Sequence, residues 1–299
     1  MTPYLLLSHM YIHNANALSS PLTVGVPAMT AWLGAVHAME RKVTQNAELQ
    51  SVRMPRVGIS FHKTALQVCN DPQFYKNFGD KAFAVLGFGK PLKENGERPS
   101  FIPEPRIHLE VSLLVELQGV NGDNEKQFLS AVNELLPMMK MAGGDLLSVK
   151  EIRVLYADHD ELPTIRKILR ALMPGYVLIE RRDLMNAEEV LPKDSLDRLL
   201  YALQLTRVRE KDEDGKVIRD KWSRAYRGWM VPIAVGFRGL SQLEKVKNRR
   251  DPSLRHQFVE NVLTLGEFKM PYRFEKLDEI LWHYHYDQKY EMYLCVNQQ

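Results

Sequence analysis

Alternation of apolar and polar positions in the first half of the chain predicts a strand, a helix and a second strand. The run "YLLLSHMYI" at residues 4–12 is apolar and rich in aromatic and branched side chains, which is typical of a buried strand. Pro27 suits the start of a helix, because its missing N–H would go unpaired there in any case. An apolar stripe at helical spacing follows, formed by Trp32, Val36, Met39 and Val43. The segment "PRVGISFHKTALQV" at residues 55–68 indicates the second strand.

Residues 106–117, "RIHLEVSLLVEL", have the alternation of a strand with one buried face. One side carries Leu109, Val111, Leu113, Val115 and Leu117, and the other carries His108, Glu110 and Ser112. This pattern is typical of a half-buried antiparallel strand. A helix is predicted at about 124–140 and, after a Gly-Gly pair, a strand at 145–156.

The order strand, helix, strand, strand, helix, strand predicts an α+β fold of the ferredoxin-like (RRM-like) sandwich type. Asn95-Gly96 is a strong hairpin signal, so we expect a long β-hairpin thumb at about 80–107, inserted between the middle strands. Residues 161–299 should form a second α+β lobe packed on a first lobe of residues 1–160. Its predicted elements are helices at 162–175, 194–205 and 276–285 and strands at 228–237, 256–268 and 291–296.

The connection between the first strand and the first helix is unusually polar. Asn14, Asn16, Ser19, Ser20 and Thr23 all lie in it, although a simple turn needs only one or two such residues. These side chains can cap the turn and the helix. They can equally form hydrogen bonds to the bases and phosphates of an unstacked single strand. The pattern alone leaves both interpretations open.

Composition is that of an ordinary globular protein, with 299 residues, 45% apolar and 26% charged. We expect a cytoplasmic protein that does not enter a membrane, because no stretch approaches the roughly 20 apolar residues of a membrane span and the N-terminus lacks the features of a secretory signal. Cys69 and Cys295 lie far apart without CxxC spacing, which favours a reduced compartment.

Net charge is only +3, so binding to nucleic acid has to be argued from the distribution of charge. Residues 216–255 contain eleven Lys and Arg against three acidic residues, with a dense segment "EKVKNRRDPSLRH". Arg249, Arg250 and Arg255 in this segment can neutralise phosphates, each contact on a single strand adding about −0.7 to the salt slope. A solvated loop with scattered charge is the alternative.

Motifs for common catalytic chemistries are missing. Gly89-Lys90 is followed by proline and lacks the upstream glycine of a P-loop, and the sequence contains no GxSxG, HExxH or Rossmann fingerprint. His283 and His285 could bind a metal together with Asp287, but neighbouring tyrosines favour packing, and we expect no metal and no cofactor. The aromatic signature of an RRM is also missing.

Two further features of the first half are chemically informative. Five histidines lie in it, at positions 9, 13, 37, 62 and 108, and His9 and His13 share a face of the predicted strand. A histidine can act as general acid or base, but spacing nominates no partner for it. Gly143 and Gly144 separate a helix from a strand, where they can form a helix C-cap or let a phosphodiester approach the backbone.

Five ordered blocks resemble one protein family. They are "NANALSSPLTVGVPAMTAWLGAVHAMERK" (14–42), "RIHLEVSLLVEL" (106–117), "MKMAGGDLL" (139–147), "GWMVPIAVGFRGLSQL" (228–243) and "HQFVENVLTLGEF" (256–268). The family is the RAMP-superfamily subunit that caps the 5′ end of the guide RNA in the type I-F CRISPR surveillance (Csy) complex. The blocks cover roughly a third of the chain closely, and residues 150–225 match loosely. One departure is Val24, which stands where members of the family carry a tryptophan.

The resemblance implies a non-catalytic, antiviral role. Such a subunit binds the 5′ handle of the guide RNA and pairs with the large subunit that reads the PAM. Its thumb contacts the adjacent backbone subunit, and target DNA is read through the guide. The RNA-binding residues implied are Asn14, Asn16, Ser19, Ser20, His37, Arg41, Gly143, Gly144, Arg249, Arg250 and Arg255. The thumb residues implied are Lys90, Lys93, Arg98 and Arg106.

Two rival functions remain from the sequence. The first is a metal-independent endoribonuclease of the same superfamily that processes CRISPR repeat RNA. The second is a protein–protein adaptor that does not touch RNA.

Overall fold

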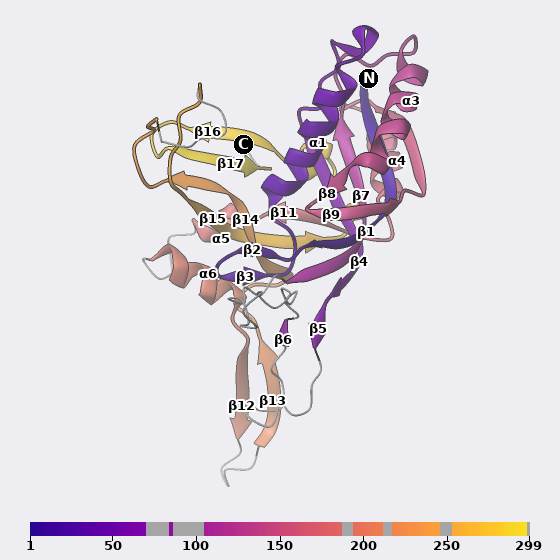
Figure 1. Ribbon diagram of the computed structural model, residues 1–299. Coiled ribbons are helices and arrows are strands. Elements are labelled where there is room, and N and C mark those ends of the chain that lie inside the picture. The colour runs from indigo at the N-terminus through magenta and orange to yellow at the C-terminus, as the bar shows by residue number, and fades with distance from the viewer. Residues whose placement is uncertain (70–83, 86–104, 187–193, 212–216, 246–252, 298–299) are drawn as a thin grey trace.

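A large antiparallel sheet organises the protein (Figure 1). The structure is a computed structural model that describes residues 1–69, 84–85, 105–186, 194–211, 217–245 and 253–297. Within these residues, 11 strands join one sheet and helices pack on both of its faces, which confirms an α+β fold. None of the helices in the described ranges is long and apolar enough to cross a membrane.

The first half contributes its strands in the order β10–β1–β7–β4, and β9 and β8 follow along the outer edge of β1. The bounds are β1 Thr2–Asn16, β4 Val57–Leu66, β7 Arg106–Glu116, β8 Lys140–Met141, β9 Gly144–Ser148 and β10 Glu151–Ala157. Helix α1 is Met29–Val43 and α3 is Glu125–Leu135. The predicted order strand, helix, strand, strand, helix, strand is therefore confirmed.

Two elements at the end of this half differ from the prediction. Helix α3 stops at Leu135 and gives way to a 3₁₀ turn, Leu136–Met138, because Pro137 cannot continue the ladder of an α-helix. The single strand predicted at 145–156 is two strands, β9 and β10. Both pair with β1, β10 along Thr2–Ser8 and β9 along Tyr11–His13, so the chain is interrupted where it passes from one register to the other.

The second half extends the same sheet in the order β16–β17–β14–β15–β11. The bounds are α4 Leu162–Ala171, β11 Tyr176–Glu180, α5 Arg182–Met185, α6 Ser195–Leu203, β14 Trp229–Gly239, β15 Val259–Lys269, β16 His283–Asp287 and β17 Met292–Val296. Strand β11 pairs with β4 on one side and β15 on the other, and so joins the halves. The division into lobes 1–160 and 161–299 thus separates segments that share a sheet, and it stays a prediction.

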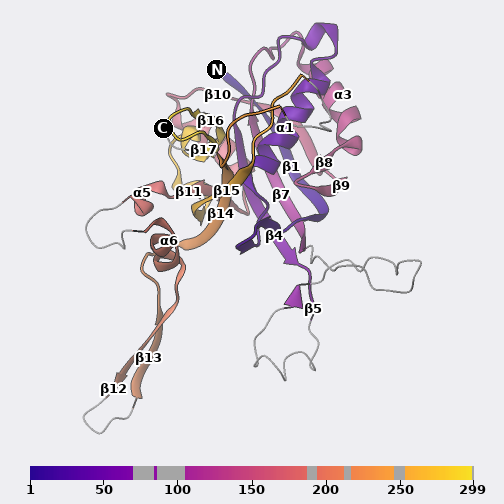
Figure 2. The same ribbon diagram turned by 60° about the vertical axis from the view of Figure 1, so that its left-hand side comes forward.

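Several elements of the second half were not predicted correctly. Strand β11 was missed, as was the hairpin of β12 (Thr206–Lys211) and β13 (Val217–Ser223), which projects from the body in Figures 1 and 2. The helix predicted at 276–285 is wrong: a 3₁₀ turn, Leu277–Ile280, leads into β16. The tip of the predicted thumb, with Asn95-Gly96, lies outside the described residues.

Short strands mark the base of the predicted thumb. Strand β5 (Val68–Cys69) pairs with β6 (Ala84–Val85) just beyond β4. Of the predicted thumb residues, Lys90, Lys93 and Arg98 lie outside the described ranges, whereas Arg106 begins β7.

Apolar residues cover the two faces of the sheet unequally. Trp32, Val36 and Met39 of α1 are fully buried on one face against alternate residues of β1 and β7. On the opposite face, Ile165 and Ile168 of α4 pack against one end of the same strands, where Tyr4, Leu6 and Leu114 are buried. A helix from the second half therefore covers only part of that face.

Candidate nucleic-acid interface

Polar side chains occupy the part of the sheet face that α4 leaves uncovered. Side chains alternate between faces along a strand, so the residues of β1, β4 and β7 that do not face α1 point to this side. We call the following set the polar face: His9, Tyr11, His13, Asn14, His62, Lys63, Gln67, His108 and Glu110. The half-buried strand predicted at 106–117 is therefore partly exposed at Arg106, His108 and Glu110, whereas Ser112 and Leu114 are buried.

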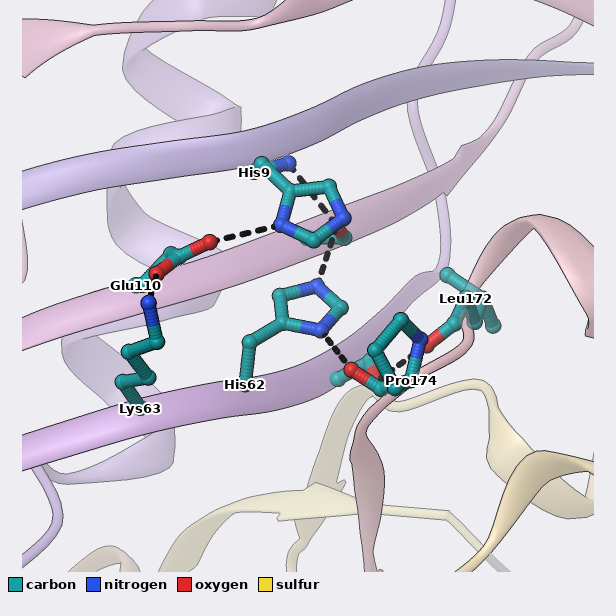
Figure 3. A network of polar contacts seen from close by, with 8 residues as sticks. His9, His62, Lys63, Glu110, Leu172 and Pro174 are labelled. Atoms are coloured by element: carbon teal, nitrogen blue, oxygen red, sulfur yellow. Dashed lines mark hydrogen bonds and ion pairs between the residues drawn. The ribbon is translucent and has the colours of Figure 1, made fainter.

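A chain of hydrogen bonds ties β1, β7 and β4 to the loop after α4 (Figure 3). The backbone N–H of His9 donates to Ser112 Oγ at 2.9 Å, and Ser112 Oγ lies 2.7 Å from His62 Nε2. His62 Nδ1 contacts the carbonyl oxygen of Pro174. A carbonyl only accepts, so Nδ1 carries the proton and Nε2 accepts from the serine hydroxyl. Burial lowers the pKa of His62, which keeps this ring neutral at pH 7.

Glu110 is the charged centre of the polar face. Its carboxylate accepts from His9 Nδ1 at 2.7 Å and forms an ion pair with Lys63 Nζ at 3.2 Å. The hydrogen bond from His9 is the main cause that holds the pKa of Glu110 below its usual range, and Lys63 adds to it. The His9 ring, which Glu110 holds, stacks on His62 with centroids 4.0 Å apart.

A second pair of histidines lies farther along the same strands. The rings of His13 and His108 stack with centroids 4.2 Å apart. The backbone N–H of Asn14 donates to His108 Nδ1 at 3.2 Å, and the amide of Gln67 donates to Asn14 Oδ1. Burial and the neighbouring His13 lower the pKa of His108.

Left-handed backbone conformations place two of these side chains. His9 has φ 47° and Asn14 has φ 55°, each at a bulge in the pairing of β1 with β7. Such values are uncommon for residues other than glycine, and bulges re-aim side chains. A third case is Ala142, with φ 50°, whose carbonyl accepts from Asn16 N–H at 3.0 Å. Uncommon backbone conformations therefore occur in the middle of β1 at His9 and around its end at Asn14 and Ala142.

The polar connection after β1 folds into a small hairpin that we call the lip, residues 18–24. It consists of β2 (Leu18–Ser20) and β3 (Thr23–Val24). The hydroxyls of Ser19 and Ser20 lie 2.8 and 2.7 Å from Thr23 Oγ1, and Leu22 N–H donates to Ser20 Oγ. Asn16 accepts from Leu18 N–H and donates to the Leu18 carbonyl. The side chains thus cap the turn, as one of the two sequence interpretations proposed.

The Gly-Gly loop lies directly behind the end of β1. A Cβ at Gly144 would lie 2.6 Å from the His13 carbonyl oxygen and 2.7 Å from the Ala15 nitrogen. Gly143 has φ 78°, and its Cβ would approach Asn16. The two glycines therefore serve close packing of this loop on β1. Arg106 is the cross-strand partner of Asn16, and its guanidinium donates to the Asn14 carbonyl at 3.4 Å.

Sequence reasoning missed an aromatic cavity beside the lip. The cavity of about 310 Å³ is lined by Ser19, Thr23 and Val24 of the lip and by Phe61, Tyr176, Trp229 and Phe268 of the sheet. Trp229 lies in a predicted strand, but its partner Tyr176 belongs to the strand that was missed. Tyr176 lies in β11 and Trp229 lies in β14, and both strands pair with β15. No local sequence pattern indicates that the two residues meet, because this pairing joins segments distant in sequence.

Other predicted site residues lie apart from the lip. His37 and Arg41 are exposed on α1, eight residues or more beyond its start at Met29, or roughly 12 Å along the axis. Arg255 is exposed near the end of the β14–β15 hairpin opposite to Trp229. Arg249 and Arg250 fall outside the described residues. Among the predicted site residues that the structure describes, it brings together Asn14, Asn16, Ser19, Ser20, Arg106, Gly143 and Gly144.

Comparison with known proteins identifies the family. A family model described as CRISPR-associated protein (Cas_Csy2) matches residues 5–295. The chain belongs to the Csy2 family of CRISPR-associated proteins. It is similar to "CRISPR-associated protein Csy2" of Pseudomonas aeruginosa (strain UCBPP-PA14), with 31% identity over 307 residues, 94% of this chain and 91% of the relative. The Csy2 match spans both halves of the sheet.

The geometry of this Csy2-family chain suits binding through hydrogen bonds. Amides, hydroxyls, imidazoles and cationic side chains meet at the end of β1, where an unstacked strand could use its base edges and phosphates. In the part of the chain that the structure describes, no group of three or more His, Cys, Asp and Glu is arranged to hold a metal ion.

Proposed function

We propose that this chain is a non-catalytic subunit of a type I-F CRISPR RNA-guided surveillance complex for antiviral DNA interference. It binds the 5′ handle of the guide RNA and pairs with the large PAM-reading subunit, while its thumb contacts the adjacent backbone subunit. Target DNA is then read by the guide. Membership in the Csy2 family supports the place in such a complex.

The observation that carries RNA binding is the meeting of the lip, the Gly-Gly loop and the polar face at the end of β1. These segments are distant in sequence, yet Asn16 contacts the Gly-Gly loop and pairs with Arg106 across the sheet. The ferredoxin-like character of the first half belongs to the same proposal, supported by the order β10–β1–β7–β4. Single-stranded RNA is recognised by such combinations of hydrogen-bonding groups and close backbone approach.

The lip has a positioning role in this proposal. Its hydroxyls already bond to one another, so Ser19 and Ser20 fix the shape of the lip, and the RNA meets its exposed backbone and outer side chains. Direct contacts come from Asn14, Arg106 and the cationic segment with Arg249, Arg250 and Arg255.

The test compares handle RNA with scrambled RNA at several salt concentrations. We expect tighter binding of the handle by the full chain. Changing Arg249, Arg250 and Arg255 to Glu should lower affinity for both RNAs and flatten the salt slope by about 0.7 for each phosphate that is no longer neutralised. The matched control changes the same residues to Lys, which keeps the charge. Equal affinity for handle and scrambled RNA, or an unchanged slope in the Glu variant, contradicts the proposal and favours the adaptor.

One observation favours the endoribonuclease as second candidate. Glu110 holds His9 through Nδ1, which is how a carboxylate orients a general base. Incubation of the full chain with labelled repeat RNA, without metal, separates the two functions. We expect intact RNA from the wild type and from His9→Ala. Specific cleavage that disappears in His9→Ala would establish the enzyme instead.

A further inference from the structure

The sheet has a notch beside the lip. Strand β11 pairs with β4 only at Val177↔Ser60 and Tyr176↔Phe61, whereas β4 continues to Leu66. Beyond Phe61, β4 pairs with β7 on one side, and its outer edge lines the aromatic cavity. An edge of this kind presents backbone N–H and C=O groups. The notch therefore combines hydrogen-bonding backbone with aromatic rings.

Aromatic residues form the wall of the notch that faces the lip. Trp229 is 51% exposed and Tyr176 is 37% exposed, and the two rings meet at 74° with centroids 5.4 Å apart. Trp229 meets Phe268 at 53° and 5.0 Å. Neither neighbour lies parallel to the indole, so neither takes a stacking position on it. A half-exposed tryptophan without a parallel aromatic neighbour is suited to stacking on an unstacked base.

The size and lining of the notch restrict its occupant. Its volume of about 310 Å³ is at the low end of small-ligand pockets, which run from roughly 300 to 1,000 Å³. One flat ring system fits that space better than a peptide segment or a duplex. The polar residues Thr64 of β4 and Thr23 of the lip line the notch together with apolar Val24. A heteroaromatic ring with polar edges matches this mixture.

We propose that the notch binds one unstacked nucleobase of single-stranded RNA, with Trp229 as its stacking partner and the edge of β4 reading its polar edge. The inference rests on the proposed function, because the lip that bounds the notch also bounds the handle interface. It adds a defined site for one base, centred on Trp229 and the edge of β4, neither of which was predicted to bind RNA.

The experiment couples a change in the protein to a change in the RNA. Each handle nucleotide is replaced in turn by an abasic residue, and affinity is measured for the full-length chain and for Trp229→Ala. We expect one position whose base removal weakens binding to the wild type by about 5- to 150-fold, the range for removal of one base–aromatic stack. The same removal should have little effect on Trp229→Ala. The matched control is Trp222→Ala, since Trp222 is also exposed (61%) but lies on the β12–β13 hairpin.

A second readout does not depend on Trp229→Ala. 2-Aminopurine at the position whose base removal most weakens binding to the wild type should lose fluorescence when the wild-type chain binds. It should keep more of its fluorescence with Trp229→Phe, whose smaller ring stacks less. This readout decides the matter even if Trp229→Ala does not fold.

The outcomes separate the inference from the proposed function. In one outcome, the wild type binds the handle selectively while no position is coupled to Trp229 and no quenching occurs. That result contradicts the base site in the notch and leaves the proposed function intact. Absence of handle selectivity in the wild type overturns both. If Trp229→Ala weakens binding of the large subunit but not of RNA, the notch holds a protein side chain, and the inference is wrong.

Discussion

Site residues could be predicted from the sequence only where they form a cluster of neighbouring positions. The cluster of Asn14, Asn16, Ser19 and Ser20 stands out from composition, and the structure gathers it around the lip. The bonding of His62 is different. Its partners Ser112 and Pro174 lie 50 and 112 residues away, and no spacing in the sequence connects them. Contacts that depend on the register of three strands are invisible until the sheet is known.

Protonation of His62 should destabilise the fold. Burial lowers its pKa in the folded chain, so below about pH 6.5 the unfolded chain binds a proton that the folded chain does not. Stability is therefore full above that pH and is lost as pH falls through the folded-state pKa. We expect the free energy of unfolding in urea to drop as the pH falls below about 6.5, and to drop less in His62→Gln.

Glutamine keeps a polar side chain that can bond to Ser112, so the variant should fold. His37→Gln is the matched control, because His37 is exposed on α1. An equal pH dependence of unfolding in the wild type and His62→Gln would contradict the assigned role of this ring.

Helices and strands could be predicted from the sequence where they are long and have one apolar face. The first half follows this rule, and its periodicities give β1, α1, β4 and β7 nearly as they occur. Strand β11 escaped detection because it has five residues and is buried on both faces, so it shows no alternation. The β12–β13 hairpin escaped for the opposite reason: charged residues such as Arg207 and Asp220 lie along it, and it has no apolar face to read.

Substitution at Gly144 should disrupt the packing of β9 on β1. A Cβ would overlap backbone atoms of His13 and Ala15, which cannot move without breaking the β1–β9 pairing. We expect Gly144→Ala to lower the free energy of unfolding by about 1–3 kcal/mol, as overpacking does. Gly122→Ala is the control, since no atom lies within 4 Å of its Cβ position. Equal stability of the two variants, measured in urea, would argue against the close approach.

The lip should lose its shape when Thr23 loses its hydroxyl. Thr23→Val removes the atom that contacts both Ser19 and Ser20. We expect handle RNA to bind more weakly by about 1–3 kcal/mol, the value of two hydrogen bonds, with little change in affinity for scrambled RNA. Thr44→Val is the control, because its hydroxyl bonds to Glu40 at the far end of α1. If Thr23→Val kept the wild-type selectivity for handle over scrambled RNA, the lip would not be part of the interface.

At the scale of the whole molecule, the sequence predicted the fold class but not the continuity of the sheet. Continuity depends on β11, and on Trp282, which is fully buried between the halves. Trp282 donates from Nε1 to the Leu178 carbonyl at 2.9 Å, and its backbone pairs with Val57. The core on the α1 face accordingly includes Phe268 and Cys295 beside Trp32. Such long-range contacts have no local signal.

Shared packing should make the two halves unfold together. Trp282→Ala removes a large buried ring and should cost about 3–5 kcal/mol. Native-state hydrogen exchange should show a similar loss of protection in β7 of the first half and β14 of the second. Trp222→Ala, on the exposed hairpin, should change stability by less than about 0.5 kcal/mol. Loss of protection confined to β14–β17 would show that the halves are independent lobes.

The most direct test of the central claim is to map where the handle touches the chain. Handle RNA carrying 4-thiouridine at each position in turn is bound to the purified complex, irradiated, and its cross-linked peptides are identified by mass spectrometry. We expect cross-links in residues 14–24, at the start of β7 near Arg106, in the Gly-Gly loop and in the cationic segment that includes Arg255, with the RNA chain uncut. Cross-links confined to α4 or to β16–β17, with residues 14–24 unlabelled, would contradict RNA binding at the end of β1.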